Sequence, residues 1–219
     1  MTSLAKIAAS GPAASGASSR VIAFPTPRAP CEPAHPEPAF HAPSLRPADV
    51  ARRQSMTWPG LCVDNVQVTR HEPFEYEFRA SFHLLIAYER ASRVAGETFL
   101  DGLPRSSLRD FSRKLTFVPA GTRFHERQTP RALLRATFFY IDARRPVLAP
   151  EALAPRLFFE DGALWQTAQK LKGLAEAGSA ANALYAEALG AVLMHELVRL
   201  GRGTPLPEPP IRGGLSGWQ

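Results

Sequence analysis

The sequence is poor in cysteine and has no long apolar run. Its 219 residues include only Cys31 and Cys62, too few for a disulfide framework or a cysteine zinc site. No stretch of about 18 apolar residues occurs, so no membrane span is predicted. The N-terminus also lacks the compact apolar core of a secretory signal. We therefore expect a protein of the reducing cytoplasm.

Patterns that indicate catalysis are missing as well. Ser106, Ser107 and His125 lie near Asp101 and Asp110 in the sequence, but no Gly-x-Ser-x-Gly elbow is present and nothing dictates a triad. No glycine-rich loop opens a predicted helix. The net charge of +6 comes from interleaved basic and acidic residues, so it predicts no direct contact with DNA. We expect no enzymatic activity.

The first part of the chain has the composition of a disordered segment. Residues 1–55 are rich in alanine, proline and serine and show almost no apolar periodicity. Such a segment cannot bury enough surface to offset the loss of chain entropy on folding. We therefore expect a disordered tail there.

A strict alternation of apolar and polar residues follows. Apolar side chains occupy nearly every even position from residue 74 to residue 88, and most odd positions are polar. A period of two predicts strands with one buried face, and a bend near Ala80 divides the region into two strands. Other short strands are predicted at Val66 and Val68, at residues 97–101 after a turn at 93–96, at Leu115 and Phe117, and at residues 131–142.

Without helices between them, these strands predict an antiparallel barrel or sandwich. Pro119, Ala120 and Gly121 form a turn in which proline fixes one backbone angle and glycine permits a positive φ. We expect this turn to fold the chain back and to aim His125 into or across a small barrel.

Beyond residue 150 the apolar period becomes helical. Leu164 and Leu171 lie on one face of a first helix, Gly178 is a predicted stop, and Ser179 is a predicted N-cap for the next helix. The second helix carries an apolar stripe of four leucines: Leu189, Leu193, Leu197 and Leu200. The pattern predicts an antiparallel two-helix hairpin.

Residues 81–126, and above all the string DGLPRSSLRDFSRKLTFVPAG, resemble the N-terminal half of an AraC-type transcription regulator. The later segments FFYID, FEDGALWQTAQKLK and GGLSGWQ are also similar to that family. The resemblance implies a cupin-like effector-binding barrel, a helical hairpin for dimerisation and a C-terminal pair of helix-turn-helix units. Trp218 and Gln219 resemble the opening of the DNA-binding part, which the 219 residues do not include.

The predicted fold is therefore mainly β with an α annex. We expect a disordered tail at residues 1–55, a cupin-like antiparallel barrel at 56–148, a dimerisation hairpin at 149–204, and a linker at 205–219 to an absent DNA-binding domain. The predicted function is effector sensing and dimerisation for transcription regulation, with DNA contacted only through that absent domain. A truncated regulator of this kind could form mixed dimers with an intact relative. The alternative is a stand-alone cupin, either a metal-dependent enzyme or a small-molecule carrier.

The alternative depends on a metal site. Metal-binding cupins resemble one another in a His-x-His pair with a nearby Glu and a further His after a Pro-x-Gly turn. In this sequence that last position is Phe124, no His-x-His occurs, and His125 is one place late. A side chain one position along a strand points to the opposite face. We therefore expect no metal and no cofactor.

A metal-free effector pocket is the preferred interpretation. Tyrosine hydroxyls could orient a small-molecule effector, and guanidinium groups could pair with an anionic one. On such strands tyrosines are also often plain core residues and arginines are often only solvated. The candidate ligand-binding residues are Tyr76, His83, Tyr88, Arg109, His125 and Tyr140.

The leucine stripe of the second predicted helix needs a covering surface. The resemblance favours a homodimer through Leu189, Leu193, Leu197 and Leu200. Packing against the barrel or the preceding helix would cover the same leucines. The stripe spans about three turns, too few to predict a sustained coiled coil.

Overall fold

The computed structural model describes residues 44–144, 153–178 and 182–203. The predicted disorder of residues 1–43 and the predicted linker at 205–219 lie outside the described residues. Within the described part, no helix is long and apolar enough to cross a membrane.

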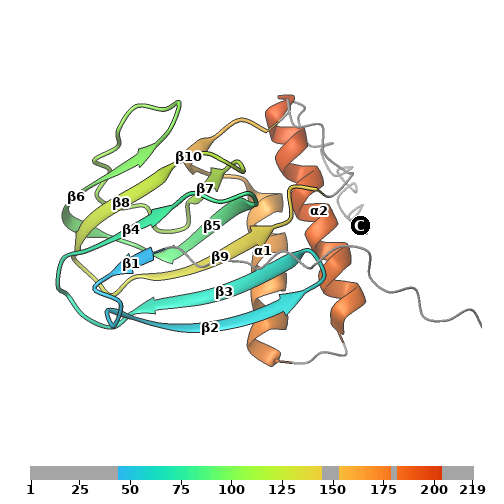
Figure 1. Cartoon of the computed structure of the whole chain (residues 1–219), viewed down its shortest axis with the longest axis horizontal. Helices are drawn as coiled ribbons and strands as arrows, with labels where there is room; N and C mark the ends of the chain where they lie inside the picture. The colour runs from blue at the N-terminus through green and yellow to red at the C-terminus, as the bar shows by residue number, and fades with distance from the viewer. Residues whose placement is uncertain (1–43, 145–152, 179–181, 204–219) are drawn as a thin grey trace, which may run out of the picture. The chain divides into compact units, whose positions relative to one another are not determined.

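In the described part of the chain, ten strands form two antiparallel sheets (Figure 1). One sheet contains, in spatial order, β1 (Ser44–Arg46), β4 (Phe74–Phe78), β8 (Phe124–Pro130) and β6 (Arg93–Leu100). The other contains β10 (Arg156–Phe159), β7 (Leu115–Val118), β5 (His83–Arg90), β9 (Arg135–Ile141), β3 (Leu61–Val68) and β2 (Ala51–Trp58). Helices α1 (Gly162–Ala177) and α2 (Ala183–Gly201) follow.

The chain changes sheet at every step from β3 to β9. Successive strands therefore face each other across the core, which is the connectivity of a double-sheet jelly roll, the architecture of cupins. The predicted fold class is confirmed: a mainly β, cupin-like fold with two helices at its C-terminal end.

The alternation in the sequence creates two separate cores. Even-numbered residues of β4 and β5, such as Phe74 and Ile86, are buried between the two sheets. Odd-numbered residues of β5 and β9, such as Leu85 and Phe139, lie on the other face of the six-stranded sheet and pack with α1 and α2. Both predicted strands of residues 74–88 are present, and the chain turns between them at residues 79–82.

The turn that begins at Pro119 directly after β7 has the predicted positive φ, because Gly121 has a φ of 79°. The predicted turn at residues 93–96 is wrong, since these residues belong to β6. Gly96 lies inside β6, opposite Gln128 and just after an irregularity in the strand pairing between Arg93 and Ala95. Its φ is 143°, and a Cβ atom there would lie 2.2 Å from the carbonyl oxygen of Arg127, so only glycine fits this close approach.

The barrel also begins earlier than the predicted boundary at residue 56. Strands β1 and β2 cover Ser44–Arg46 and Ala51–Trp58. Most of β2 is exposed, because it is an edge strand of the six-stranded sheet. An exposed edge strand carries polar residues on both faces, so it gave no apolar periodicity in the sequence.

Local chemistry sets both ends of α1. The carboxylate of Asp161 accepts a 2.8 Å hydrogen bond from the Leu164 backbone N–H and caps α1. Gly178 ends α1 with a left-handed φ of 65°, as predicted. The predicted cap Ser179 lies outside the described residues. Helices α1 and α2 lie next to each other beside the six-stranded sheet (Figure 1).

Candidate functional site

A polar cluster lies in the mainly apolar space between the sheets. Strand β8 turns Glu126 and Gln128 inward by simple alternation. Tyr76 on β4 and Tyr88 on β5 reach the same place. None of these side chains is more than 3% exposed. We call these four residues the interior cluster.

The interior cluster is held together by its own hydrogen bonds. Both tyrosine hydroxyls lie 3.0 Å from Oε2 of Glu126, and they lie 2.8 Å from each other. The other carboxylate oxygen, Oε1, accepts a 2.7 Å hydrogen bond from Nε2 of Gln128. A carboxylate removed from water needs such donors, because an unpaired buried charge is very unfavourable.

A buried cation adds to this arrangement. Arg93, at the start of β6, is 1% exposed. Its guanidinium donates to the carbonyl oxygens of Leu108 and Ser106 and to Oγ1 of Thr98, at 2.7, 2.9 and 2.9 Å. It also lies 5.2 Å from the ring centre of Phe111, a cation–π contact. Arg93 therefore ties the segment between β6 and β7 to the barrel.

The electrostatics of Glu126 reflect its burial. Burial raises the pKa of Glu126 from its ordinary 4.5 to about 7, although the charge of Arg93 and the hydrogen bonds from Tyr76 and Tyr88 act in the opposite direction. Burial and the charge of Glu126 also raise the pKa of both tyrosines well above 10. The hydroxyls consequently stay protonated near neutral pH, while Glu126 can change its protonation state there.

Gln128 leaves one hydrogen-bond acceptor unused. Its Oε1 is buried and has no donor among the described residues. Buried polar atoms in native proteins nearly always have a partner. The interior cluster can therefore accept one more N–H or O–H group, from a small molecule or from water.

A second polar group lies between the sheets, next to the edge strand β2. Arg53 forms an ion pair with the buried carboxylate of Asp64 on β3, with its Nε 2.8 Å from Oδ2. Ser55 donates a 3.1 Å hydrogen bond to the same carboxylate. Arg53 also donates to the hydroxyl of Tyr140 at 3.2 Å. Here the arginine and the carboxylate neutralise each other.

Three of the six candidate ligand-binding residues lie between the sheets. Tyr76 and Tyr88 belong to the interior cluster, and Tyr140 contacts Arg53. Sequence alternation placed all three correctly on the inner face. Their role as ligand contacts stays a prediction.

The other three candidates lie elsewhere and do not converge with the tyrosines. His83 is on the helix-facing side of β5, where its Nδ1 accepts a 3.0 Å hydrogen bond from the Ala120 N–H. Arg109 is exposed in the segment between β6 and β7. His125 is half-exposed on the outer face of β8, 3.6 Å from Glu75. It points outward because its neighbour Phe124 is buried on the inner face.

The leucine stripe of α2 packs within the chain. Leu189, Leu193 and Leu197 are 7%, 0% and 3% exposed, and they join the core between the six-stranded sheet and α1. Leu200 packs against the same core. The stripe is therefore covered within the chain, by the six-stranded sheet of the barrel and by the preceding helix.

Sequence reasoning missed Glu126, Gln128 and Arg93. A signal for the first two existed, because Phe124, Glu126, Gln128 and Pro130 share one register behind the Pro-Ala-Gly turn. A glutamate in the register of a buried phenylalanine indicates a polar group inside the core. Arg93 gives no such signal, because the local sequence of residues 93–96 predicts a turn and not a strand.

Of the interior cluster, only Gln128 lines one of the four described cavities, a surface cavity that it shares with Gly96 and His125. None of the four is lined by Tyr76, Tyr88 or Glu126. The described residues also bring no three His, Cys, Asp or Glu side chains close enough to hold a metal ion. The interior donor set is one carboxyl, one amide and two phenols, which suits hydrogen bonding to a polar organic molecule.

No known protein-family model matches the sequence, and no curated protein matches it either. Comparison with solved structures finds cupins at low similarity. The EutQ protein of Clostridium difficile is 15% identical, and the match covers 45% of this chain and 72% of that chain with a TM-score of 0.33.

Two further structures give the same picture. An RmlC-like cupin from Shewanella frigidimarina is 12% identical over 45% of this chain and 82% of that chain, with a TM-score of 0.34. A cupin domain from Bordetella pertussis is 14% identical over 42% of this chain and 94% of that chain, with a TM-score of 0.31. The cupin-like fold of this chain follows from its strand order.

Proposed function

We propose that this chain is the effector-sensing part of an AraC-type transcription regulator. The resemblance of residues 81–126 to that family suggests the role, and the attachment of a helix pair to a jelly-roll barrel fits it. The observation that carries the proposal is the interior cluster, with its unpaired acceptor on Gln128. The proposed role is binding without chemical conversion, in the cytoplasm.

The access route to the interior cluster runs past Phe158 on β10. The ring of Phe158 lies 5.8 Å from that of Tyr88 and 4.7 Å from that of Phe111. Phe158 also lines a surface cavity of about 760 Å³, together with Leu157 and the segment that follows β6. Phe158 has a φ of 49°, a conformation that is unfavourable for a bulky residue. Displacement of Phe158 would release this strain and open the cluster to an effector.

Movement of β10 would reach the helices directly. Arg156 on β10 donates a 2.6 Å hydrogen bond to the carbonyl oxygen of Leu200, near the end of α2. Asp161, which caps α1, pairs with Arg199 at 2.8 Å. An effector shifts such an equilibrium only if it binds the two arrangements with different affinities. We propose that the open position of β10 binds the effector better, so that occupancy is transmitted to the C-terminal end of α2.

The proposed homodimer uses the exposed side of α2 and not the leucine stripe. Leu184, Tyr185 and Val192 are 84%, 52% and 45% exposed, and their spacing places them on one side of the helix. A second copy would cover these apolar side chains. Contact with DNA is assigned to a C-terminal domain outside the 219 residues.

A thermal-shift screen of small polar molecules tests the interior site, because a compound that binds only the folded state raises its melting temperature. Hits are compared on the wild type and on Gln128→Leu, which removes the unpaired acceptor. We expect the shift to fall in Gln128→Leu. We also expect tryptophan fluorescence, to which Trp165 on α1 contributes, to change on binding to the wild type. Hits that bind both proteins equally, with unchanged fluorescence, would contradict the proposal.

Analytical ultracentrifugation tests the dimer. We expect the wild type to sediment as a concentration-dependent dimer, and the double variant Leu184→Glu/Val192→Glu to sediment as a monomer. Glu187→Ala, a change on the same helix outside the apolar patch, is the control. A monomeric wild type at high concentration would overturn this part of the proposal.

A further inference from the structure

The outer face of the six-stranded sheet is divided into two halves. Two rows of side chains across β2, β3, β9 and β5 are mainly apolar and lie under the helices: Trp58, Leu61, Ile141 and His83, then Met56, Val63, Phe139 and Leu85. The next two rows on the same face are mainly polar: Gln54, Asn65, Thr137 and Ala87, then Arg52, Gln67 and Arg135.

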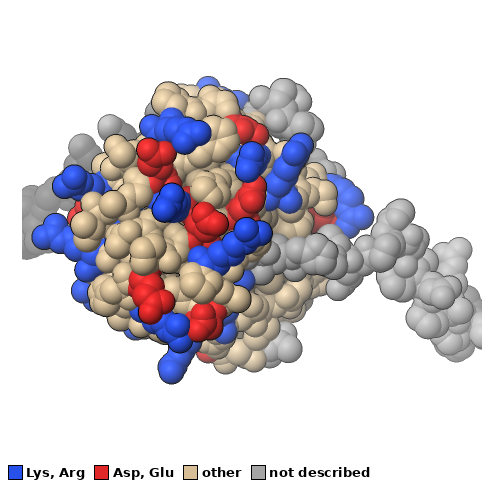
Figure 2. Space-filling model, turned by 60° about the vertical axis from the view of Figure 1, so that its left-hand side comes forward, with Lys and Arg blue, Asp and Glu red and all other residues tan. Residues whose placement is uncertain are grey.

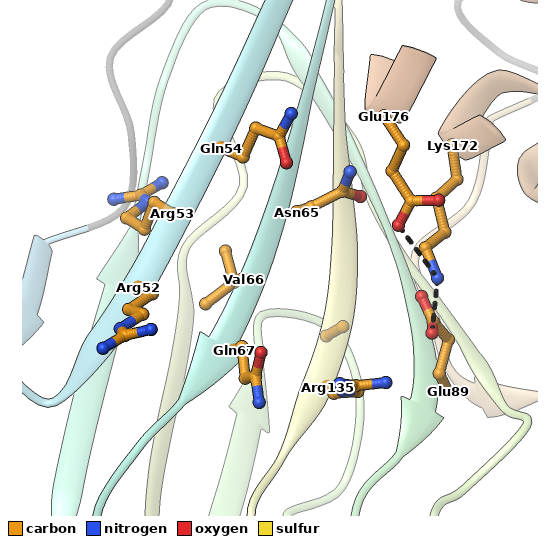
Figure 3. Close-up of a pocket in the computed structure, with 11 residues that line it drawn as sticks. Arg52, Arg53, Gln54, Asn65, Val66, Gln67, Glu89, Arg135, Lys172 and Glu176 are labelled. Atoms are coloured by element: carbon orange, nitrogen blue, oxygen red, sulfur yellow. Dashed lines mark hydrogen bonds and ion pairs between the residues drawn. The ribbon is translucent and has the colours of Figure 1, made fainter. Parts of the chain in front are cut away.

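The polar half contains a cavity of about 390 Å³ that we call the outer groove (Figure 3). Its floor includes Arg52, Gln54, Asn65, Gln67 and Arg135 from three neighbouring strands. Lys172 and Glu176 of α1 form one wall together with Glu89 of β5 (Figure 3). This volume is within the range of small-molecule sites.

The basic residues of the outer groove differ in how they are paired. Lys172 lies 2.7 Å from Glu89 and 3.5 Å from Glu176, so its charge is neutralised. Arg53 is neutralised by Asp64 on the opposite face of β2. Arg52 and Arg135 make no side-chain ion pair or hydrogen bond with any described residue, although both line the groove.

The two unpaired arginines are placed to act together. Arg52 is opposite Gln67 on β3, and Gln67 is opposite Arg135 on β9. With strands about 4.8 Å apart, their Cα atoms are separated by roughly 10 Å, and both side chains lie on one face. Two long guanidinium side chains at this distance can grip one oxyanion, or two linked ones, from either side of Gln67.

The groove floor also contains an unmet donor. Oδ1 of Asn65 accepts a 3.0 Å hydrogen bond from Thr137, but its Nδ2 is buried and has no acceptor among the described residues. A buried amide N–H without an acceptor is rare in native proteins unless a ligand or water accepts its hydrogen bond. Asn65 thus adds a donor for an oxygen atom beside the two arginines.

We propose that the outer groove binds a small organic anion carrying carboxylate or phosphate groups. Arg52 and Arg135 hold the anionic groups, and the amides of Gln54, Asn65 and Gln67 bind its remaining polar atoms. The paired wall of Lys172, Glu89 and Glu176 limits the length of the ligand. The site lies on the opposite face of the sheet from the interior cluster and does not depend on the proposed effector site.

Calorimetric titration at constant ionic strength tests this proposal with two probes, citrate and inorganic phosphate. We expect saturable binding of at least one probe to the wild type, and their relative affinities distinguish a carboxylate site from a phosphate site. Arg52→Gln/Arg135→Gln should weaken binding by at least about tenfold, the loss expected when charge-assisted hydrogen bonds are removed. Both positions are exposed, so an unchanged melting temperature verifies folding.

Arg79→Gln is the matched control, since Arg79 is an exposed arginine that lines none of the described cavities. It should leave the affinity unchanged, and so should Gln128→Leu in the interior cluster. Two results would overturn the proposal: no saturable binding of either probe, or an equal loss of affinity in Arg79→Gln, which would indicate general attraction to positive charge. An equal loss in Gln128→Leu would instead place the bound anion inside the barrel.

Discussion

The charged groups of the barrel interior all have protein partners, whereas Arg52 and Arg135 of the outer groove have no side-chain partner in the described chain. Arg93 donates three hydrogen bonds and lies over an aromatic ring. Water can solvate Arg52 and Arg135 but cannot reach Arg93, which is 1% exposed. Burial therefore decides whether a charge must find protein partners.

The comparison separates two kinds of binding. In the two proposals, a ligand in the outer groove replaces water and needs no rearrangement of protein hydrogen bonds. A ligand at the interior cluster would first displace side chains such as Phe158, so its binding would be coupled to a conformational change. The surface turned to the viewer in Figure 2 shows a third arrangement, in which basic and acidic side chains lie next to each other and no large field of one sign forms.

The largest expected effect is the removal of the buried guanidinium. Arg93→Met should lower the free energy of unfolding by about 4 kcal/mol, because it leaves buried acceptors unsatisfied and removes a positive charge near Glu126. Arg135→Met is the matched change in the outer groove and should cost less than about 1 kcal/mol. Urea denaturation of both variants measures the difference. Similar losses of unfolding free energy in the two variants would show that Arg93 and Arg135 are in similar environments.

The apolar half of the outer sheet face should be almost as sensitive. Leu193→Ala should cost about 3 kcal/mol, because a fully buried side chain between α2 and the sheet is replaced by a cavity. The loss should not depend on protein concentration, since Leu193 packs within the chain. Denaturation at several concentrations checks this. A loss of unfolding free energy that appears only at concentrations where a dimer forms would instead place Leu193 in a dimer interface.

A smaller effect is expected from the protonation of Glu126. Its folded-state pKa, about 7, lies above the ordinary 4.5, so the folded state binds the proton more tightly than the unfolded state does. The resulting stability is fully present below about pH 4.5 and is lost as the pH rises through about 7. Between about pH 5 and about pH 8 this amounts to roughly 2 kcal/mol.

Glu126→Gln removes this titration, so the difference in unfolding free energy between wild type and variant should change with pH by that amount. His83 acts in the opposite sense: burial lowers its pKa, so it contributes stability that grows as the pH rises towards 6.5. The comparison with Glu126→Gln cancels this contribution, because His83 is present in both proteins. A pH-independent difference between them would show that Glu126 does not titrate in this range.

Local pattern was sufficient to predict much of the fold. The alternation of residues 74–88 predicted two strands and the inward direction of Tyr76 and Tyr88. The Pro-Ala-Gly turn predicted the positive φ of Gly121. The helix stop at Gly178 follows from glycine geometry alone. Each of these features depends on a few neighbouring residues, which a single sequence contains.

The site could not be predicted in the same way, because it depends on distant pairings. Glu126 meets Tyr88 across 38 positions of sequence and Tyr76 across 50. Nothing near Glu126 indicates that two phenols from other strands will satisfy it. The outer groove depends on the register of β2, an exposed strand with no apolar periodicity. Long-range register, and not local propensity, places both polar regions.

The smallest effect concerns one hydroxyl of the interior cluster. Tyr88→Phe removes a donor to Glu126 and should cost about 1 kcal/mol below about pH 5, where the carboxyl is neutral. At higher pH the cost should grow, because the hydroxyl stabilises the charged form and holds the pKa of Glu126 down. Tyr185→Phe on the exposed side of α2 should have no measurable effect at any pH. If the cost of Tyr88→Phe stayed constant with pH, the Tyr88 hydroxyl would be bonded to Tyr76 and not to Glu126. The charge of Glu126 would then not depend on a protein donor, in contrast to the difference between buried and exposed charges.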